Sequence, residues 1–225
     1  MEADLRVDAS AATAAAVTFG SNIIKVSVGE KSQTFNVHEA VLCASSQFFK
    51  NACKEEWASL RPDRNSLSLS HDDPADFEVY VYWLYYGKLP TSRNAKPSEE
   101  ENAKLFRSYV LGEQLLDVRF KNAVMTALIA TCCHKPNRER VYFTPKDVST
   151  IWSGTPPGSP IRKLILDAVA WVAHNGLERG WMGTIKACSK EVLVEFMEAV
   201  LNLRKGPTGE RPWENEQSLY MEKEA

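Results

Sequence analysis

A change in the spacing of apolar residues between Phe35 and Phe49 constrains the fold more than any other feature of this sequence. Phe35 and Val37 alternate with polar neighbours, which is typical of a half-buried strand. From Ala40 onward the apolar residues recur at steps of three and four, which is typical of a helix. The sequence therefore predicts a strand that ends at His38 and passes into a helix almost without a loop.

Two further strands are predicted around this one. Ile24, Val26 and Val28 alternate with polar residues, and the polar stretch 29–32 separates this run from the next as a hairpin turn would. A short alternation of leucines and serines over 66–70 is well placed to pair with the hairpin. We therefore expect a small sheet of about three strands.

Helix start and stop signals follow the strands. Asp73, directly before a proline, predicts a capped helix start, and Gly87 predicts the end of that helix. Ser98 and Glu101 form a capping box that predicts another helix. Helical spacing continues to about residue 131. Residues 22–133 are therefore expected to form one α+β unit.

Three ordered segments of this unit resemble the BTB/POZ domain family. In the first, a strand Phe is followed by a His, a Leu four residues later, a Ser and a terminal Phe; these are Phe35, His38, Leu42, Ser46 and Phe49. The segment 77–89 is similar to the family's helix with an aromatic-x-Gly end, here at Gly87, and 109–128 resembles its closing helical hairpin. The resemblance implies a BTB/POZ fold, in which a small sheet packs in a cluster of helices.

Beyond residue 134 the pattern changes to helices alone. Thr144 and Asp147 predict a capped helix start, the stretch 155–160 predicts a turn, and Ser189 predicts the cap of a last helix. This part resembles the helical extension of many fungal BTB proteins, and we expect it to pack back on the core. The predicted division is a flexible segment (1–20), a BTB/POZ domain (21–134), a helical extension (135–204) and a disordered tail (205–225).

Most residues of the signature are expected to maintain the fold. Phe35, Leu42, Phe48 and Phe49 are predicted to be core residues that seal the strand onto the helix. His38 lies at the junction with no second ligand at metal-binding spacing, so a hydrogen-bonded structural role is favoured over a catalytic or metal-binding one.

Catalytic, cofactor and metal motifs are not found in the sequence. It contains no G-x-S-x-G, Gly-rich phosphate loop, H-E-x-x-H or C-x-x-C. Cys132, Cys133 and His134 are adjacent, so on a helix they cannot jointly bind one ion. The cysteines are expected to be buried thiols in a reducing compartment. We therefore predict a protein that is not an enzyme and has no cofactor or metal.

Charge and hydropathy exclude two further classes of partner. The 27 basic and 29 acidic side chains nearly balance, and no basic stripe is visible, which argues against nucleic-acid binding. The longest uncharged run, 123–133, is too short to span a membrane, and the N-terminal residues lack the pattern of a signal peptide. We expect the protein to reside in the cytoplasm, the nucleus or both.

The resemblance implies a function through association with other proteins. BTB domains characteristically homodimerise or present a groove to a partner, and many are adaptors that dock on the cullin scaffold of a ubiquitin ligase. The leading hypothesis is an adaptor or scaffold with protein partners, among them a second copy of this chain and a cullin. One alternative is a monomeric linker of the elongin-C kind that binds a helical box through 109–131. The other is an enzyme or nucleic-acid-binding protein whose site is formed by the extension near His134 or His174, which we disfavour.

Two departures from the family pattern bear on the partner. Family members often carry an Asp at the start of the first strand and a cation after the His, where this sequence has Asn22 and Glu39. This altered charged pocket disfavours a corepressor platform. Cullin-binding members tend to carry a hydrophobic-x-Glu motif, which falls here on Trp57-Ala58-Ser59 and therefore lacks the Glu.

Aromatic residues supply the candidate partner surface. Trp57 lies in a charged setting, where it is either a lid on the core, the favoured interpretation, or an exposed anchor for a partner. Five aromatics on one predicted helix cannot share one side, so some must face a second surface; they are Tyr80, Tyr82, Trp83, Tyr85 and Tyr86. The candidate partner residues are Trp57, Tyr82 and Tyr86.

Overall fold

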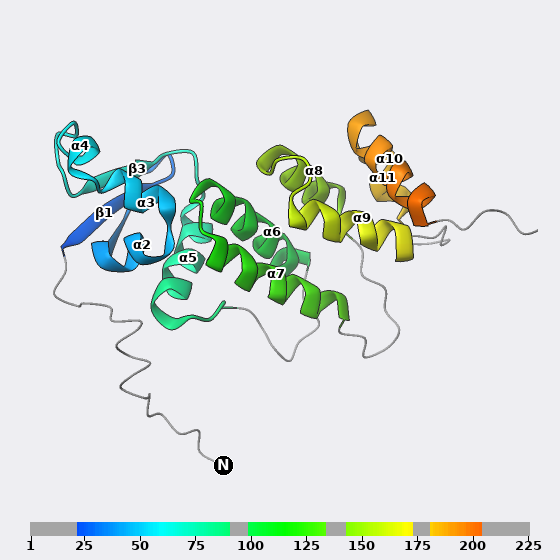
Figure 1. Cartoon of the computed structure of the whole chain (residues 1–225), viewed down its shortest axis with the longest axis horizontal. Helices are drawn as coiled ribbons and strands as arrows, with labels where there is room; N and C mark the ends of the chain where they lie inside the picture. Colours follow the sequence, from blue (N-terminus) through cyan, green and yellow to red (C-terminus); the bar gives the residue numbers. More distant parts are fainter. Residues whose placement is uncertain (1–21, 91–98, 134–142, 173–180, 204–225) are drawn as a thin grey trace, which may run out of the picture.

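The computed structural model describes residues 22–90, 99–133, 143–172 and 181–203. In these ranges the chain has the predicted α+β fold, with a three-stranded sheet and a larger set of helices. Figure 1 shows the sheet at one end of the molecule, helices α5 to α7 in the middle and helices α8 to α11 at the other end. The predictions of a flexible segment at 1–20 and a disordered tail at 205–225 lie outside the described residues.

The sheet is built on a central strand whose apolar side chains are buried. β1 (Ile23–Val28) pairs antiparallel with β2 (Gln33–His38), and β3 (Ser66–Leu69) pairs parallel with β1 on its other edge. Gly29, with φ at 75°, allows the tight turn between β1 and β2. The predicted hairpin and its third strand are therefore confirmed.

Strand β2 passes directly into the first helices. α2 (Glu39–Ser45) begins at the residue after His38, as predicted, and is followed by α3 (Gln47–Ala52) and the short α4 (Glu55–Ala58). The next helix, α5 (Pro74–Tyr86), has the predicted ends. The Asp73 side chain accepts a hydrogen bond from the amide of Ala75, and Gly87 adopts a left-handed conformation with its N–H donating to Trp83 at 2.8 Å.

The core prediction for the signature phenylalanines is only partly right. Leu42 and Phe49 are fully buried, whereas Phe35 and Phe48 are partly exposed and pack against the edge of the core. Phe77 of α5 meets both Phe35 and Phe49 edge to face, with ring centroids 5.1 and 6.4 Å apart. These contacts join α5 to the strand–helix junction.

Two long helices form the hairpin in the middle of the molecule. They are α6 (Glu99–Gln114) and α7 (Val118–Cys133), and they pack along each other. The amide of Phe120 donates to the side chain of Asp117 at 2.9 Å, which caps α7. Ser98, the predicted cap of α6, lies outside the described residues.

The extension consists of α8 (Pro145–Gly154), α9 (Pro160–Val172), α10 (Met182–Ala187) and α11 (Lys190–Leu203). Thr144 and Asp147 form a reciprocal capping box, and the Ser189 hydroxyl accepts a hydrogen bond from the amide of Val192 at 3.4 Å. Both predicted caps are confirmed. Helix α10 was not predicted, because its six residues are too few to produce a clear apolar period.

The extension packs on the core, as predicted. α8 lies against α6, and Gly154 at the end of α8 approaches the Val110 side chain so closely that an added Cβ would collide with it. The ring of Phe143 meets Phe106 of α6 and Trp181 at centroid distances of 5.5 and 5.6 Å, edge to face in both cases. One hydrophobic core therefore runs from the sheet into the extension.

A buried arginine holds the helices of the extension together. Arg162 of α9 donates hydrogen bonds to the Trp152 carbonyl at 2.8 Å and to both oxygens of Thr155. Its guanidinium also lies 3.6 Å from the carboxylate of Glu195 on α11 and over the ring of Trp152. This one side chain therefore links α8, α9 and α11.

Candidate functional site

The strand–helix junction is fixed by hydrogen bonds between His38 and Tyr85. The backbone N–H of His38 donates to the Tyr85 hydroxyl at 3.1 Å, and the same hydroxyl lies 2.7 Å from Nδ1 of the ring. A hydroxyl that accepts the backbone N–H is free to donate its own proton to Nδ1. His38 thus ties the end of β2 to α5, which confirms the predicted structural role.

Ser46 of the signature joins two helices. Its hydroxyl donates to the carbonyl of Leu115 at 2.6 Å and accepts from the amide of Phe49 at 3.1 Å. The first bond reaches the end of α6, and the second caps the start of α3. Since Ser46 is buried, the motif keeps a serine here to satisfy polar groups that water cannot reach.

A buried tyrosine–carboxylate pair anchors α5 to the turn between α6 and α7. The hydroxyl of Tyr80 donates to Asp117 at 2.8 Å, and both side chains are completely buried. Burial raises the pKa of Tyr80 far above its usual value, and the negative charge of Asp117 raises it further. The sequence analysis missed Asp117, although an aspartate three residues before the first buried aromatic of a helix is a recognisable cap.

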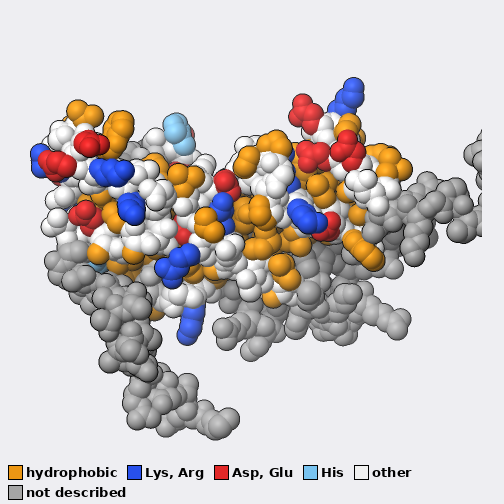
Figure 2. Space-filling view, in the orientation of Figure 1, with side chains coloured by type: hydrophobic (Ala, Val, Ile, Leu, Met, Phe, Trp, Pro, Cys, Tyr) orange, Lys and Arg blue, Asp and Glu red, His pale blue; other side chains and the backbone are white. Residues whose placement is uncertain are grey.

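Trp57 is exposed at the end of the molecule that carries α4. Its side chain is 59% accessible and that of Leu60 is 75% accessible, and Figure 2 shows hydrophobic side chains on the outside of this end. The prediction that Trp57 is a lid on the core is therefore wrong. α4 is a single turn that projects from the sheet, so the core offers no surface to cover the indole.

Tyr82 and Tyr86 form a second exposed aromatic pair. They are 41% and 65% accessible and lie one helical turn apart on α5, with ring centroids 4.6 Å apart and ring planes tilted by 34°. Tyr80 and Trp83 of the same helix are buried, so the aromatics do divide between two faces, as predicted. The end of α5 lies well away from α4 in Figure 1, which makes the pair a separate surface from Trp57 and Leu60.

The comparison with known families now identifies the part of the chain that holds these features. A family model of the BTB/POZ domain matches residues 24–115. These residues form a BTB/POZ domain. Such domains bind other proteins and self-associate, and the family is not typically enzymatic. A search of the curated proteins finds no relative of the chain.

The two altered positions of the BTB/POZ charged pocket lie side by side. The side-chain amide of Asn22 donates to the carboxylate of Glu39 at 3.4 Å, and the Asn22 carbonyl accepts the Glu39 amide at 2.8 Å. Both residues were singled out from sequence for their departure from the family pattern. Their contact places a carboxylate, not a cation, at the start of α2.

The extension beyond the BTB/POZ domain carries a third apolar surface. Trp171 of α9 is 73% accessible and Val194, Met197 and Leu201 of α11 are also exposed, a region that Figure 2 shows with many hydrophobic side chains. An open groove of about 530 Å³ lies between α9 and α11, and Lys163, Asp167 and Glu198 are among its lining residues. Val200 of α11 is exposed as well.

The remaining predictions concern catalysis and membranes. His134 and His174, near which a polar cleft was considered, lie outside the described residues. Within the described parts of the chain, no helix is both long and apolar enough to cross a membrane.

Proposed function

We propose that this chain is an adaptor or scaffold whose BTB/POZ domain binds a protein partner through Trp57 and Leu60. The observation that carries the proposal is the exposure of two large apolar side chains at the end of the domain, Trp57 on the one-turn helix α4 and Leu60 two residues after it. Trp is enriched among the residues that dominate binding energies, where it fills a pocket of the partner. Burial of two such side chains stabilises a complex by roughly 1.5–3 kcal/mol each.

The partner proposed is a cullin scaffold. Trp57 occupies the hydrophobic position of the hydrophobic-x-Glu motif, and its exposure leaves the side chain available for binding. Ser59, at the position of the Glu, is also exposed but carries no charge. Glu55 and Glu56 are exposed on the same turn, and Glu55 forms an ion pair with Arg64 at 2.7 Å. We propose that Glu56 replaces the missing carboxylate.

A binding measurement with purified protein tests this proposal. The full chain and its Trp57→Ala variant are titrated with the purified N-terminal domain of a cullin by isothermal titration calorimetry. Trp171→Ala is the matched control, because Trp171 is even more exposed than Trp57 but lies on the extension. We expect Trp57→Ala to weaken binding at least about 30-fold, which corresponds to about 2 kcal/mol, and Trp171→Ala to leave it unchanged. Absence of binding by the unaltered chain, or equal loss in both variants, contradicts the proposal.

Self-association is proposed as part of the same function. The family commonly forms homodimers, and the solution mass measured by light scattering at micromolar concentration decides between a monomer and a dimer. The elongin-C-like alternative predicts a monomer that binds a helical box through residues 109–131. One observation weighs against it: α8 already packs on α6, which supplies the first residues of that surface, 109–114.

A further inference from the structure

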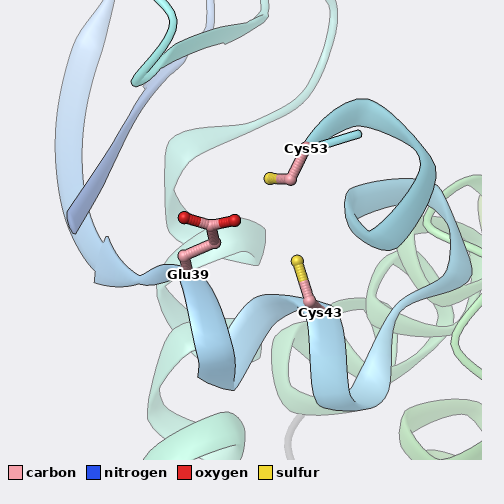
Figure 3. A group of neighbouring side chains, drawn as sticks. All are labelled: Glu39, Cys43 and Cys53. Atoms are coloured by element: carbon pink, nitrogen blue, oxygen red, sulfur yellow. The ribbon is translucent and has the colours of Figure 1, made fainter. Parts of the chain in front are cut away.

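Three potential metal ligands converge between α2 and α3. Glu39 and Cys43 lie one turn apart on the same face of α2, and Cys53 follows the last residue of α3. Figure 3 shows the three side chains pointing into one space. A carboxylate oxygen and the two sulfur atoms all lie within 4.8 Å of one another. Each residue is half-buried, so the space is shielded but reachable from solvent.

The backbone geometry of the strand–helix junction brings these three residues together. At Ser46 the backbone is extended, with φ −96° and ψ 124°, and this break turns α3 back so that its end faces α2. The direct passage from β2 into α2 places Glu39 at the mouth of this bend. The Asn22 amide donates to the Glu39 carboxylate at 3.4 Å and supplies the kind of outer hydrogen bond that orients metal ligands.

The spacing suits a tetrahedral ion after small side-chain movements. With zinc–sulfur bonds of about 2.3 Å and zinc–oxygen bonds of about 2.0 Å, ligand atoms of a tetrahedral site lie roughly 3.5–4 Å apart. Separations of at most 4.8 Å therefore close by about 1 Å through rotation of the cysteine and glutamate side chains.

We propose that Glu39, Cys43 and Cys53 bind one zinc ion, with the fourth position open to water. Two thiolates select a thiophilic metal over magnesium or calcium, and a carboxylate is an ordinary third ligand for zinc. The ion displaces the two thiol protons into solvent. Two thiolates and one carboxylate leave one negative charge on the loaded site, and Lys50 and Arg61 lie close enough to interact with the two sulfurs.

The ion would link the start of α2 to the end of α3, directly before the segment that carries Trp57. This link would fix the position of the residues that connect α3 to α4. The proposal stands independently of the proposed partner, because it rests on the ligand geometry alone.

Cobalt spectroscopy on the full chain tests the site directly. The reduced protein is titrated with Co²⁺, and zinc then displaces the cobalt. We expect one equivalent of Co²⁺ to give a thiolate-to-cobalt charge-transfer band in the near ultraviolet and intense visible bands of a tetrahedral ion. Cys43→Ser and Cys53→Ser should weaken binding at least about 10–100-fold, and Glu39→Gln should weaken it while the charge-transfer band remains.

Matched controls separate this site from the other thiols. Cys188→Ser removes a half-buried thiol of the extension, and a double Cys132→Ser, Cys133→Ser variant removes the adjacent pair; both should bind cobalt as the unaltered chain does. Thermal unfolding gives a second readout, in which a fixed zinc concentration raises the melting temperature of the unaltered chain more than that of Glu39→Gln. Absence of the charge-transfer band, its persistence in Cys43→Ser and Cys53→Ser, or its loss in the double variant overturns the proposal. If a cysteine variant does not fold, the Glu39→Gln melting result decides.

Discussion

Replacement of Tyr80 by Phe should destabilise the fold at neutral pH and change its response to alkali. The hydroxyl of Tyr80 donates to Asp117 over 2.8 Å, and both side chains are completely buried. A hydrogen bond to a charged group contributes roughly 1.5–3 kcal/mol, and its removal also leaves a buried carboxylate oxygen without this donor. We therefore expect Tyr80→Phe to lower the free energy of unfolding by about 2–3 kcal/mol at pH 7.

The effect of pH follows from the raised pKa of Tyr80. The unfolded chain releases this proton near pH 10, whereas burial and then the charge of Asp117 raise the pKa in the folded chain. Above pH 10 the folded state keeps a proton that the unfolded state has lost. The stabilisation that Tyr80 provides is therefore complete below pH 10. Above pH 10 it decreases, because the equilibrium constant of unfolding rises by about tenfold for each pH unit. Tyr80→Phe has no such proton, so its disadvantage should shrink above pH 10.

Urea unfolding monitored by circular dichroism between pH 7 and pH 11.5 measures both effects. Tyr86→Phe is the matched control, because Tyr86 lies on the same helix but is exposed, and its loss should change stability by less than about 0.5 kcal/mol at pH 7. A loss below 0.5 kcal/mol for Tyr80→Phe at pH 7, or a constant difference from the unaltered chain across the pH range, would refute the reasoning.

Three further substitutions test how the extension and the signature are held, each by urea unfolding. Gly154→Ala should destabilise the fold by about 1–3 kcal/mol, because the new methyl group collides with Val110. The control Gly183→Ala has open space around the new methyl group and should be neutral or slightly stabilising. Equal effects of the two substitutions would contradict the packing of α8 on α6. Arg162→Met keeps the apolar volume but removes the buried guanidinium, so a loss of about 3 kcal/mol is expected, and no loss would mean that this network does not hold the extension. Ser46→Ala removes a cap and a buried donor and should cost about 1–2 kcal/mol, a value that an unchanged midpoint would disprove.

The sequence by itself determined the local structure of this protein. The apolar period located the strand–helix junction at His38, and side chains that bond to nearby amides located the ends of α5 and α8. These signals act between residues two to four positions apart, so they do not depend on contacts with distant parts of the chain. Part of the BTB/POZ signature is of this kind, since Ser46 caps α3 and Gly87 ends α5, although the Ser46 hydroxyl also donates to the distant carbonyl of Leu115.

The tertiary structure alone decided which side chains are exposed and which distant residues meet. Trp57 was expected to cover the core, but whether an aromatic is buried depends on what packs against it, and among the described residues none covers the indole on this one-turn helix. Asp117 became the buried partner of Tyr80, and Arg162 met Glu195, only through the packing of helices far apart in sequence. Cys53 lies ten residues from Cys43, and the bend at Ser46 brings the two sulfurs together beside Glu39. A search for short metal motifs cannot find such a cluster, because its spacing is set by the angle between two helices.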